Sequence, residues 1–473
     1  MDSNLSKSHR KHLIQRTRRN LKNRRRLAPT EIILIGFISL ILAGTLLLSL
    51  PVSSADGTFT SLRSSLFTAT SATCVTGLIV EDTGTHWNLF GQIVIITLIQ
   101  IGGLGFMTMA VMMSIFIKRQ ITPRERLLVA QSLGLSGIGG TVKLVRRILI
   151  GTFTIEGTGA VVLATQFVPI FGWAKGIYYG IFHSISAFCN AGFDVLDGTA
   201  GYGGNFSSFT TLNDNYIIGT TLMLLVVIGG IGFIIWDDIV NFVKEGKKFS
   251  VYSRFVVGVT AVLIIGGTML IALCEWNNPD TIGNMSAADK LFQCLFQSIT
   301  TRTAGIDMIN NAAMTESSKL VSMLLMFIGG ASGSTAGGIK VGTFGVVIFA
   351  VLAFAKGEKE LVIKGRRIPH ETVIRALTVI GIDLLAVFIT TLIITNTSDV
   401  SIIDALYEAF SGIATVGLSL SITPTLSLAG HIAIIMLMFF GRVGILTITY
   451  SIMLKQARKN SCITYPEINM MIG

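Results

Sequence analysis

Apolar residues gather in eight long runs along the chain, separated by short polar segments. The runs cover about residues 31–51, 90–117, 146–168, 216–243, 254–276, 318–357, 374–396 and 431–455. An α-helix needs about 20 mostly apolar residues to cross a bilayer. The pattern therefore predicts an all-α polytopic membrane protein.

A shorter, semi-apolar segment lies between the two runs of each pair and ends in a glycine motif. The four motifs are Val75-Thr76-Gly77, Asn190-Ala191-Gly192, Thr303-Ala304-Gly305 and Thr415-Val416-Gly417. Their nearly equal spacing indicates internal repeats. We predict a basic arm at 1–28, repeats at 29–120, 140–245, 250–358 and 370–458, and a tail at 459–473.

These segments are too short to cross the membrane. About ten residues separate a leading aromatic residue, such as Phe67, from the motif glycine, which is about 15 Å of helix or half a bilayer. Because both flanking spans place the segment at the outer side, we expect a re-entrant pore helix followed by an extended stretch. Irregular backbone at this depth is tolerated only where it is buried in protein or lines water.

Four such loops around one axis would aim carbonyl oxygens at a dehydrated cation, as in a potassium filter. The sequence therefore predicts four repeats of span, re-entrant pore helix and span around a central ion pore, with potassium at the carbonyls of the twelve motif residues. The alternative is that the glycines only allow close helix packing. A second glycine cluster lies inside each second span and begins at Gly102, Gly229, Gly329 or Gly441. For this cluster, close helix packing and a role in the ion pathway are both possible functions.

The run at 318–357 is about twice as long as one crossing requires. Small and polar residues fill its middle, namely Gly329, Gly330, Ser332, Gly333, Ser334, Thr335, Gly337 and Gly338. Because this stretch has little helix propensity, we expect two half-helices joined by an intramembrane gate loop at 329–338. The alternative is one long tilted helix with a glycine-rich packing face.

Two cations lie at the same depth, Lys340 just after this loop and Arg442 inside the last span. A charge at membrane depth is costly and is usually paired or functional. We expect Arg442 to donate hydrogen bonds to carbonyl oxygens of the loop and to repel cations from the closed pore. The alternative is a salt bridge to Glu156 or Asp383 that only holds helices together.

Further charged residues lie beside the motifs. Arg302 adjoins the third motif, where it points either into the pore or back into the protein. Carboxylates follow the first three motifs, at Glu81, Asp82, Asp194, Asp197 and Asp307. They either raise the cation concentration at an outer mouth or belong to ordinary solvated loops.

The composition excludes a soluble globular enzyme, because 51% of the residues are hydrophobic and only 13% are charged, against about a quarter charged in soluble domains. The net charge is +11, and most Lys and Arg lie in the N-terminal arm and in the loops that follow each pair of spans. The positive-inside rule then places both termini and three internal loops of this multi-pass protein on the cytoplasmic side of the cell membrane. Anionic membrane lipid explains these clusters better than nucleic acid does.

No catalytic or cofactor motif stands out. The five cysteines show no paired short spacing, the six histidines are scattered, and neither HExxH, GxSxG nor a phosphate-binding glycine loop occurs. We therefore expect no enzyme activity and no covalently bound cofactor. Cation movement driven by the membrane potential is the mechanism that remains.

The four span–half-helix–span units, one glycine per motif and the Thr-Val-Gly at 415–417 resemble the Trk/Ktr/HKT superfamily of cation transporters over about residues 30–460. The membrane (KtrB-like) subunit of bacterial Ktr potassium uptake systems is the most similar branch. In that family four filter glycines favour potassium, and a serine in the first position shifts selectivity towards sodium. Gly77, Gly192, Gly305 and Gly417 therefore imply potassium.

The resemblance also implies an intramembrane gate loop, a homodimer and a cytosolic ring of nucleotide-binding (RCK-type) regulatory subunits. Sodium as an activator stays open. The alternative function is a sodium-conducting or sodium-coupled transporter of the same fold.

Overall fold

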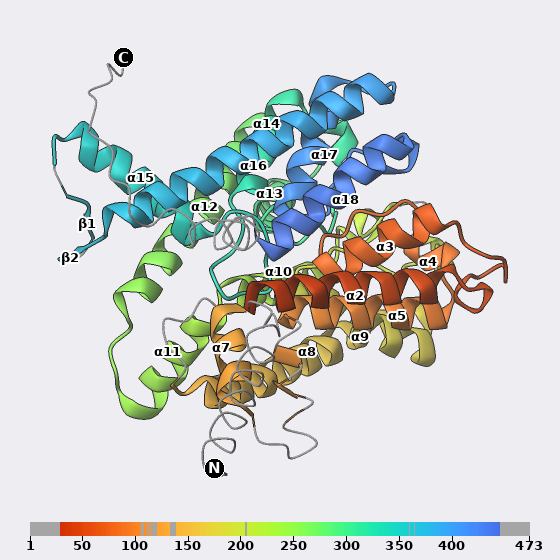
Figure 1. The fold of residues 1–473 in the computed structure, drawn as a ribbon. Helices are drawn as coiled ribbons and strands as arrows, with labels where there is room; N and C mark the ends of the chain where they lie inside the picture. The colour runs from red at the N-terminus through yellow and green to blue at the C-terminus, as the bar shows by residue number, and fades with distance from the viewer. Residues whose placement is uncertain are drawn as a thin grey trace, which may run out of the picture.

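The computed structural model describes residues 29–444 except 106–107, 110, 113, 115–120, 133–138, 204–205, 359 and 364. The predicted arm at 1–28, the tail at 459–473 and the end of the last predicted span lie outside the described residues. Figure 1 shows a bundle of helices with α16 and α8 on opposite sides, and with α11 and a small hairpin at one end.

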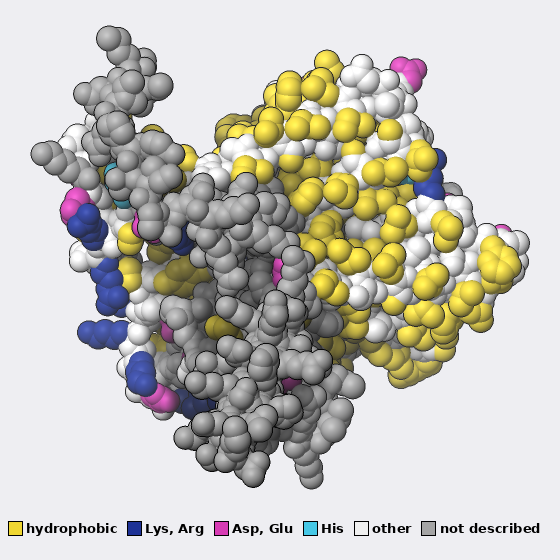
Figure 2. All heavy atoms as spheres, in the orientation of Figure 1, with side chains coloured by type: hydrophobic (Ala, Val, Ile, Leu, Met, Phe, Trp, Pro, Cys, Tyr) yellow, Lys and Arg dark blue, Asp and Glu magenta, His cyan; other side chains and the backbone are white. Residues whose placement is uncertain are grey.

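The first helix of each repeat crosses in one piece. These helices are α2 (Pro29–Ser49), α8 (Thr141–Phe171), α12 (Val251–Glu275) and α16 (His370–Thr397). They are the four described helices that are long and apolar enough to span a membrane unbroken. Large apolar side chains on them, such as Leu46, Val262 and Phe388, are exposed, as expected for a lipid-facing surface. Figure 2 shows such side chains spread over the face that includes α16 and α18.

Four shorter helices follow these spans, and we call them the pore helices. They are α3 (Leu62–Cys74), α9 (Trp173–Cys189), α13 (Ala287–Thr300) and α17 (Ile402–Ala414). Three begin at a serine N-cap, Ser61, Ser286 or Ser401, whose hydroxyl accepts the backbone N–H three residues later. Each pore helix ends just before its glycine motif, as the sequence predicts.

The second-span helices close the repeats into a ring. They are α5 (Leu89–Leu104), α10 (Tyr216–Gly230), α14 (Glu316–Phe327) and α18 (Leu428–Val443). Each packs against the pore helix of the next repeat, α5 on α9, α10 on α13, α14 on α17, and finally α18 on α3. The last contact joins the fourth repeat to the first, so the predicted architecture of four repeats is confirmed.

The second-span helices of repeats 1 and 2 end inside the apolar runs at 90–117 and 216–243, and the described part of the repeat 4 run is helical only to Val443. A glycine follows the last helical residue by one or two positions, at Gly105, Gly232 or Gly444, with φ of 85°, 99° and 85°, and glycine adopts this left-handed region without the strain that a Cβ brings. In repeat 2 the chain continues as α11 (Phe233–Glu245), bent by 95° from α10. In repeat 3 the predicted break is present, because residues between α14 and α15 (Val341–Ala355) form no helix.

The remaining elements are short. They are α4 (Thr83–His86), α7 (Pro123–Ser132), the 3₁₀ turns Pro51–Ser53, Thr199–Gly201, Thr210–Leu212, Asn311–Ala313 and Thr423–Thr425, and the hairpin strands β1 (Val362–Ile363) and β2 (Arg366–Arg367). The hairpin was not predicted from the sequence. Figure 2 shows Lys and Arg side chains gathered at the end of the molecule where α11 and this hairpin lie.

The first glycine of the second cluster serves close packing. A Cβ built on Gly102 would meet the carbonyl oxygen of Thr73, and one on Gly229 or Gly441 would meet that of Phe188 or Ile413. These three carbonyls belong to the last turn of the pore helix in the same repeat, four residues before the motif glycine. The contact places each pore helix at a fixed depth against its second span.

We expect Gly102→Ala to destabilise the folded protein by about 1–3 kcal/mol, because the added methyl group overpacks this contact. Gly157→Ala is the matched control, since Gly157 lies in α8 with nothing within 4 Å of an added Cβ and a helical alanine there gains about 0.5–1 kcal/mol. Thermal unfolding of the purified protein in detergent measures both. Equal melting temperatures for the two variants would contradict the packing role.

Candidate functional site

The four motif glycines meet at the centre of the ring. A Cβ on Gly77 would lie 2.5 Å from the carbonyl oxygen of Ala191 and 3.1 Å from the Cα of Gly192. One on Gly192 would lie 2.9 Å from the carbonyl oxygen of Ala304. The same approach links Gly305 to Gly417 and Gly417 back to Gly77, each with the other's Cα about 3 Å away. The structure therefore brings all four together, and a side chain on any of them would strike its neighbour's backbone.

The backbone takes the same path in all four motifs. The first motif residue, Val75, Asn190, Thr303 or Thr415, is left-handed with φ between 51° and 67°. Three of these residues are β-branched, for which this conformation is costly and is kept only where the surroundings enforce it. The motif glycines also have positive φ, from 69° to 97°. Four repetitions of an unfavourable conformation indicate that the path of this backbone is what the site requires.

A hydroxyl in each pore helix holds the motif in place. Ser71 accepts the N–H of Gly77 and Ser411 that of Gly417, both at 3.1 Å. Thr300 exchanges two bonds with Ile306, and Ser186 donates to the carbonyl oxygen of Phe193. The sequence shows each of these hydroxyls four residues after the leading aromatic residue. Their role as anchors emerges only from the structure.

The predicted 329–338 loop is closed by backbone hydrogen bonds at its base. Gly329 N–H donates to the carbonyl oxygen of Ile339 at 2.8 Å, and Val341 N–H donates to that of Gly330 at 3.0 Å. The alternative of one long tilted helix is therefore wrong for residues 318–357. The loop's small residues allow this narrow hairpin-like course.

The loop lies against the motifs of two repeats that face each other across the ring. Thr335 Oγ1 lies 3.0 Å from Asn190 Oδ1 in repeat 2. A Cβ on Gly337 would meet the side chain of Thr415 in repeat 4, and one on Gly338 would lie 3.1 Å from the Cα of Ala414. Because repeats 2 and 4 are opposite one another, a loop that touches both crosses the central axis.

Arg442 binds this loop to the first repeat. Its guanidinium donates to the carbonyl oxygen of Thr335 and, at 2.6 Å and 3.0 Å, to those of Gly102 and Gly103 at the end of α5. The expected hydrogen bond to the loop is thus present. No ion pair among the described residues joins Arg442 to Glu156 or Asp383, and Glu156 instead accepts from the Gln100 amide.

Two further cations bind loop carbonyls. Lys340 Nζ donates to the carbonyl oxygens of Ala336 and Gly337 at 2.7 Å and 3.3 Å. Arg302 is 6% exposed and donates to the carbonyl oxygen of Gly329 at 2.9 Å. Arg302 therefore points back into the protein towards the loop. Three positive side chains thus satisfy carbonyl groups that no helix satisfies.

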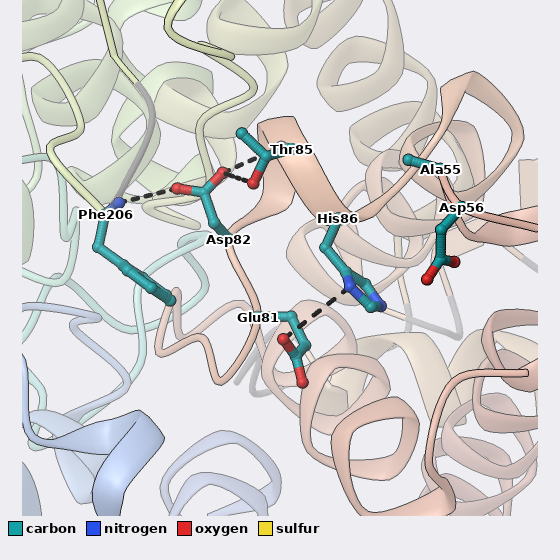
Figure 3. A pocket seen from close by; sticks show the side chains of 7 residues that line it. All are labelled: Ala55, Asp56, Glu81, Asp82, Thr85, His86 and Phe206. Atoms are coloured by element: carbon teal, nitrogen blue, oxygen red, sulfur yellow. Dashed lines mark hydrogen bonds and ion pairs between the residues drawn. The ribbon is translucent and has the colours of Figure 1, made fainter. Parts of the chain in front are cut away.

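Two of the predicted outer carboxylates line a hollow of about 360 Å³ on repeat 1 (Figure 3). Glu81 lies there beside His86, with Oε2 and Nδ1 3.9 Å apart. Asp82 instead accepts hydrogen bonds from Thr85 in α4 and, at 2.8 Å, from the N–H of Phe206 in repeat 2. Asp82 therefore joins two repeats, whereas Glu81 lines the hollow and also accepts a hydrogen bond from Ser64 at 2.9 Å.

The other three outer carboxylates belong to repeats 2 and 3. Asp194 and Asp307 lie two residues beyond their motif glycines and are partly buried. Asp197 forms an ion pair with Lys175 at 2.8 Å. Burial alone would raise the pKa of Asp197, but hydrogen bonds from Lys175 and Thr199 lower it to about 2. Asp197 is therefore a charged but already paired group.

Comparisons with known proteins agree with this architecture. Residues 6–461 match the family model TrkH, described as cation transport protein. The chain is 39% identical to the potassium/sodium uptake protein NtpJ of Enterococcus hirae, over 95% of this chain and 98% of that protein. It is 38% identical to the Ktr system potassium uptake protein B of Bacillus subtilis, over 95% and 97%.

A solved structure shares the fold. The crystal structure of the potassium transporter TrkH from Vibrio parahaemolyticus superposes with a TM-score of 0.70 at 18% identity, covering 90% of this chain and 86% of that one. The chain therefore belongs to the TrkH family of cation transport proteins, and it is a multi-pass membrane transporter rather than an enzyme.

Proposed function

We propose that this chain is the pore-forming subunit of a potassium uptake system. The observation that carries the proposal is the ring of four glycines, in which a backbone carbonyl oxygen of the next repeat lies within 3 Å of the place that a Cβ would take on each glycine. Carbonyl oxygens arranged around an axis replace the hydration shell of a potassium ion. An interior-negative membrane potential contributes about 2.3 kcal/mol per charge per 100 mV, which drives uptake.

Sodium transport is the second candidate, because one relative is named a potassium/sodium uptake protein. Four glycines in the ring favour potassium as the main substrate. Sodium as an activator or coupled ion is compatible with the same architecture, and uptake measured with and without sodium distinguishes the two roles.

The 329–338 loop is proposed to be the gate. It crosses the axis beside the first motif residues of repeats 2 and 4, and Arg442 places a guanidinium beside it. A fixed positive charge on the pathway repels a cation until the loop moves. Breaking the bond from Arg442 to Thr335 would then favour the open pore.

Regulation is proposed to come from partners on the cytoplasmic side. A homodimer and a cytosolic nucleotide-binding ring are what the resemblance to Ktr systems implies, and two relatives carry the name Ktr system protein B. By the positive-inside rule, the basic end of the molecule with α11 and the β1–β2 hairpin is the proposed cytoplasmic face. Both termini would lie on that side.

Gly77→Ser tests the filter. The serine side chain would meet Ala191 and Gly417, so we expect discrimination between potassium and sodium to fall about tenfold, the effect of about 1.4 kcal/mol. The measurement is ion uptake by bacteria that lack their own potassium uptake systems and express this chain with a regulatory partner. Gly57→Ser is the matched control, since Gly57 also has positive φ, 70°, but nothing within 4 Å of an added Cβ. Equal selectivity in the two variants would exclude Gly77 from the filter.

Arg442→Gln tests the gate. Loss of the guanidinium removes the charge and the bonds to Thr335, Gly102 and Gly103, so uptake in the same cells should rise several-fold when the regulatory partner is absent. Arg375→Gln is the control, because Arg375 is exposed on α16 and pairs only with Glu371 among the described residues. Unchanged uptake kinetics in Arg442→Gln at normal abundance would contradict the gating role of Arg442.

A further inference from the structure

A fully buried polar residue occupies the same position in every pore helix, three residues before the anchoring hydroxyl. The four residues are Thr68, His183, Gln297 and Glu408, each with 0% exposure. Their chemistry differs between repeats, and none belongs to the glycine motifs. A polar group at this depth requires a partner or a function.

In repeats 2 and 3 this residue is hydrogen-bonded, directly or through one other side chain, to the segment that follows the motif glycine. His183 Nε2 accepts the N–H of Val195 at 3.3 Å. Gln297 donates to Asn311 Oδ1 at 2.7 Å, and Asn311 donates to Asp307 Oδ1 at 2.5 Å. Val195 and Asp307 lie within three residues of Gly192 and Gly305. In repeat 1 the Thr68 hydroxyl has no hydrogen-bond partner among the described residues.

Repeat 4 makes the same connection with a carboxyl group. The Thr423 hydroxyl donates to Glu408 Oε1, and Ser419 Oγ lies 3.1 Å from Thr423 Oγ1. Ser419 is two residues beyond Gly417. The second oxygen of Glu408 is buried and receives no hydrogen bond of standard geometry from the described residues. The hydroxyls of Thr423 and Ser419 both lie beside this carboxyl, and a buried carboxyl is costly unless such donors satisfy it.

The connection extends to the first repeat through a histidine of defined tautomer. Arg63 Nε, in α3, donates to His431 Nδ1 at 2.6 Å, and a guanidinium is only a donor. The ring proton is therefore on Nε2, which donates to the carbonyl oxygen of Thr423 at 2.7 Å. Arg63 also donates to the carbonyl oxygen of Leu426. Thr423 is thus held from both sides at the seam where the chain's first and last repeats meet.

Building on the proposed potassium filter, we propose that Glu408 is a positioning residue that sets ion selectivity. Through Thr423 it fixes the segment that leaves Gly417, and through His431 and Arg63 this segment is anchored to repeat 1. Because Gly417 and Gly77 approach each other at this seam, a shift of the segment would alter the spacing of the carbonyl ring. Glu408 acts by accepting the Thr423 hydrogen bond, not by its charge.

The test compares four variants of the full chain in potassium-uptake-deficient bacteria that also express the regulatory partner. Thr423→Val and Glu408→Leu remove the hydrogen bond, whereas Glu408→Gln keeps an acceptor oxygen. Thr425→Val is the matched control, because Thr425 lies on the same 3₁₀ turn but is exposed and donates only to Ile422. Rubidium uptake in competition with potassium and with sodium gives the half-saturating concentration and the selectivity, and membrane abundance is measured alongside.

We expect Thr423→Val and Glu408→Leu to reduce potassium-over-sodium discrimination about three- to tenfold, as loss of one hydrogen bond would. Glu408→Gln and Thr425→Val should stay close to wild type. Unchanged discrimination in Thr423→Val at normal abundance would overturn the proposal, and so would equal damage from Glu408→Gln and Glu408→Leu. If Glu408→Leu does not accumulate in the membrane, the discrimination of Thr423→Val compared with that of Glu408→Gln tests the proposal.

The outcomes separate this role from the proposed function. A wild-type chain that took up no potassium would overturn the potassium assignment and this role with it. Wild-type uptake that prefers potassium, with discrimination intact in Thr423→Val, would overturn only the role of Glu408.

Discussion

The structure depends on four stretches of backbone approaching one another at a single axis. Gly77, Gly192, Gly305 and Gly417 meet so closely that a Cβ on any of them would strike the next repeat. Such an approach requires residues without side chains, and it leaves carbonyl groups without helical partners at membrane depth. Every other contact in the centre can be understood as a means of holding this backbone in place.

The contacts that hold this backbone form two sets, one on each side of the glycine motifs. Hydroxyls of the pore helices, such as Ser71 and Ser411, bind the motif backbone itself. On the other side, the 329–338 loop and the end of α5 present carbonyl oxygens, to which Arg442, Lys340 and Arg302 donate hydrogen bonds. Cations are suited to this task because each donates several hydrogen bonds and complements the negative end of a helix. The same positive charges lie where a cation path would have to be closed.

The four repeats share one architecture but differ in their second spans and in one buried pore-helix residue. After the second-span helix the chain continues as a helix bent by 95° in repeat 2 and as the crossing loop in repeat 3. The buried position behind the anchoring hydroxyl holds threonine, histidine, glutamine and glutamate in turn. A single chain can vary each repeat independently, which four identical subunits could not do, and this allows one loop to cross the axis without three copies clashing with it.

The sequence by itself determined the elements whose cause is local. The length of the apolar runs, the four glycine motifs and the run of small residues at 329–338 predicted the spans, the pore helices and the loop, because length, periodicity and propensity act over a few residues. The sequence did not reveal that α5 and α10 end next to Gly105 and Gly232, although each of these glycines lies three residues after a packing glycine. Only the tertiary structure decided the partners of Arg302 and Arg442 and the connection from Glu408 to Arg63. These contacts join residues far apart in the chain, and which of them form depends on how the four repeats close into a ring.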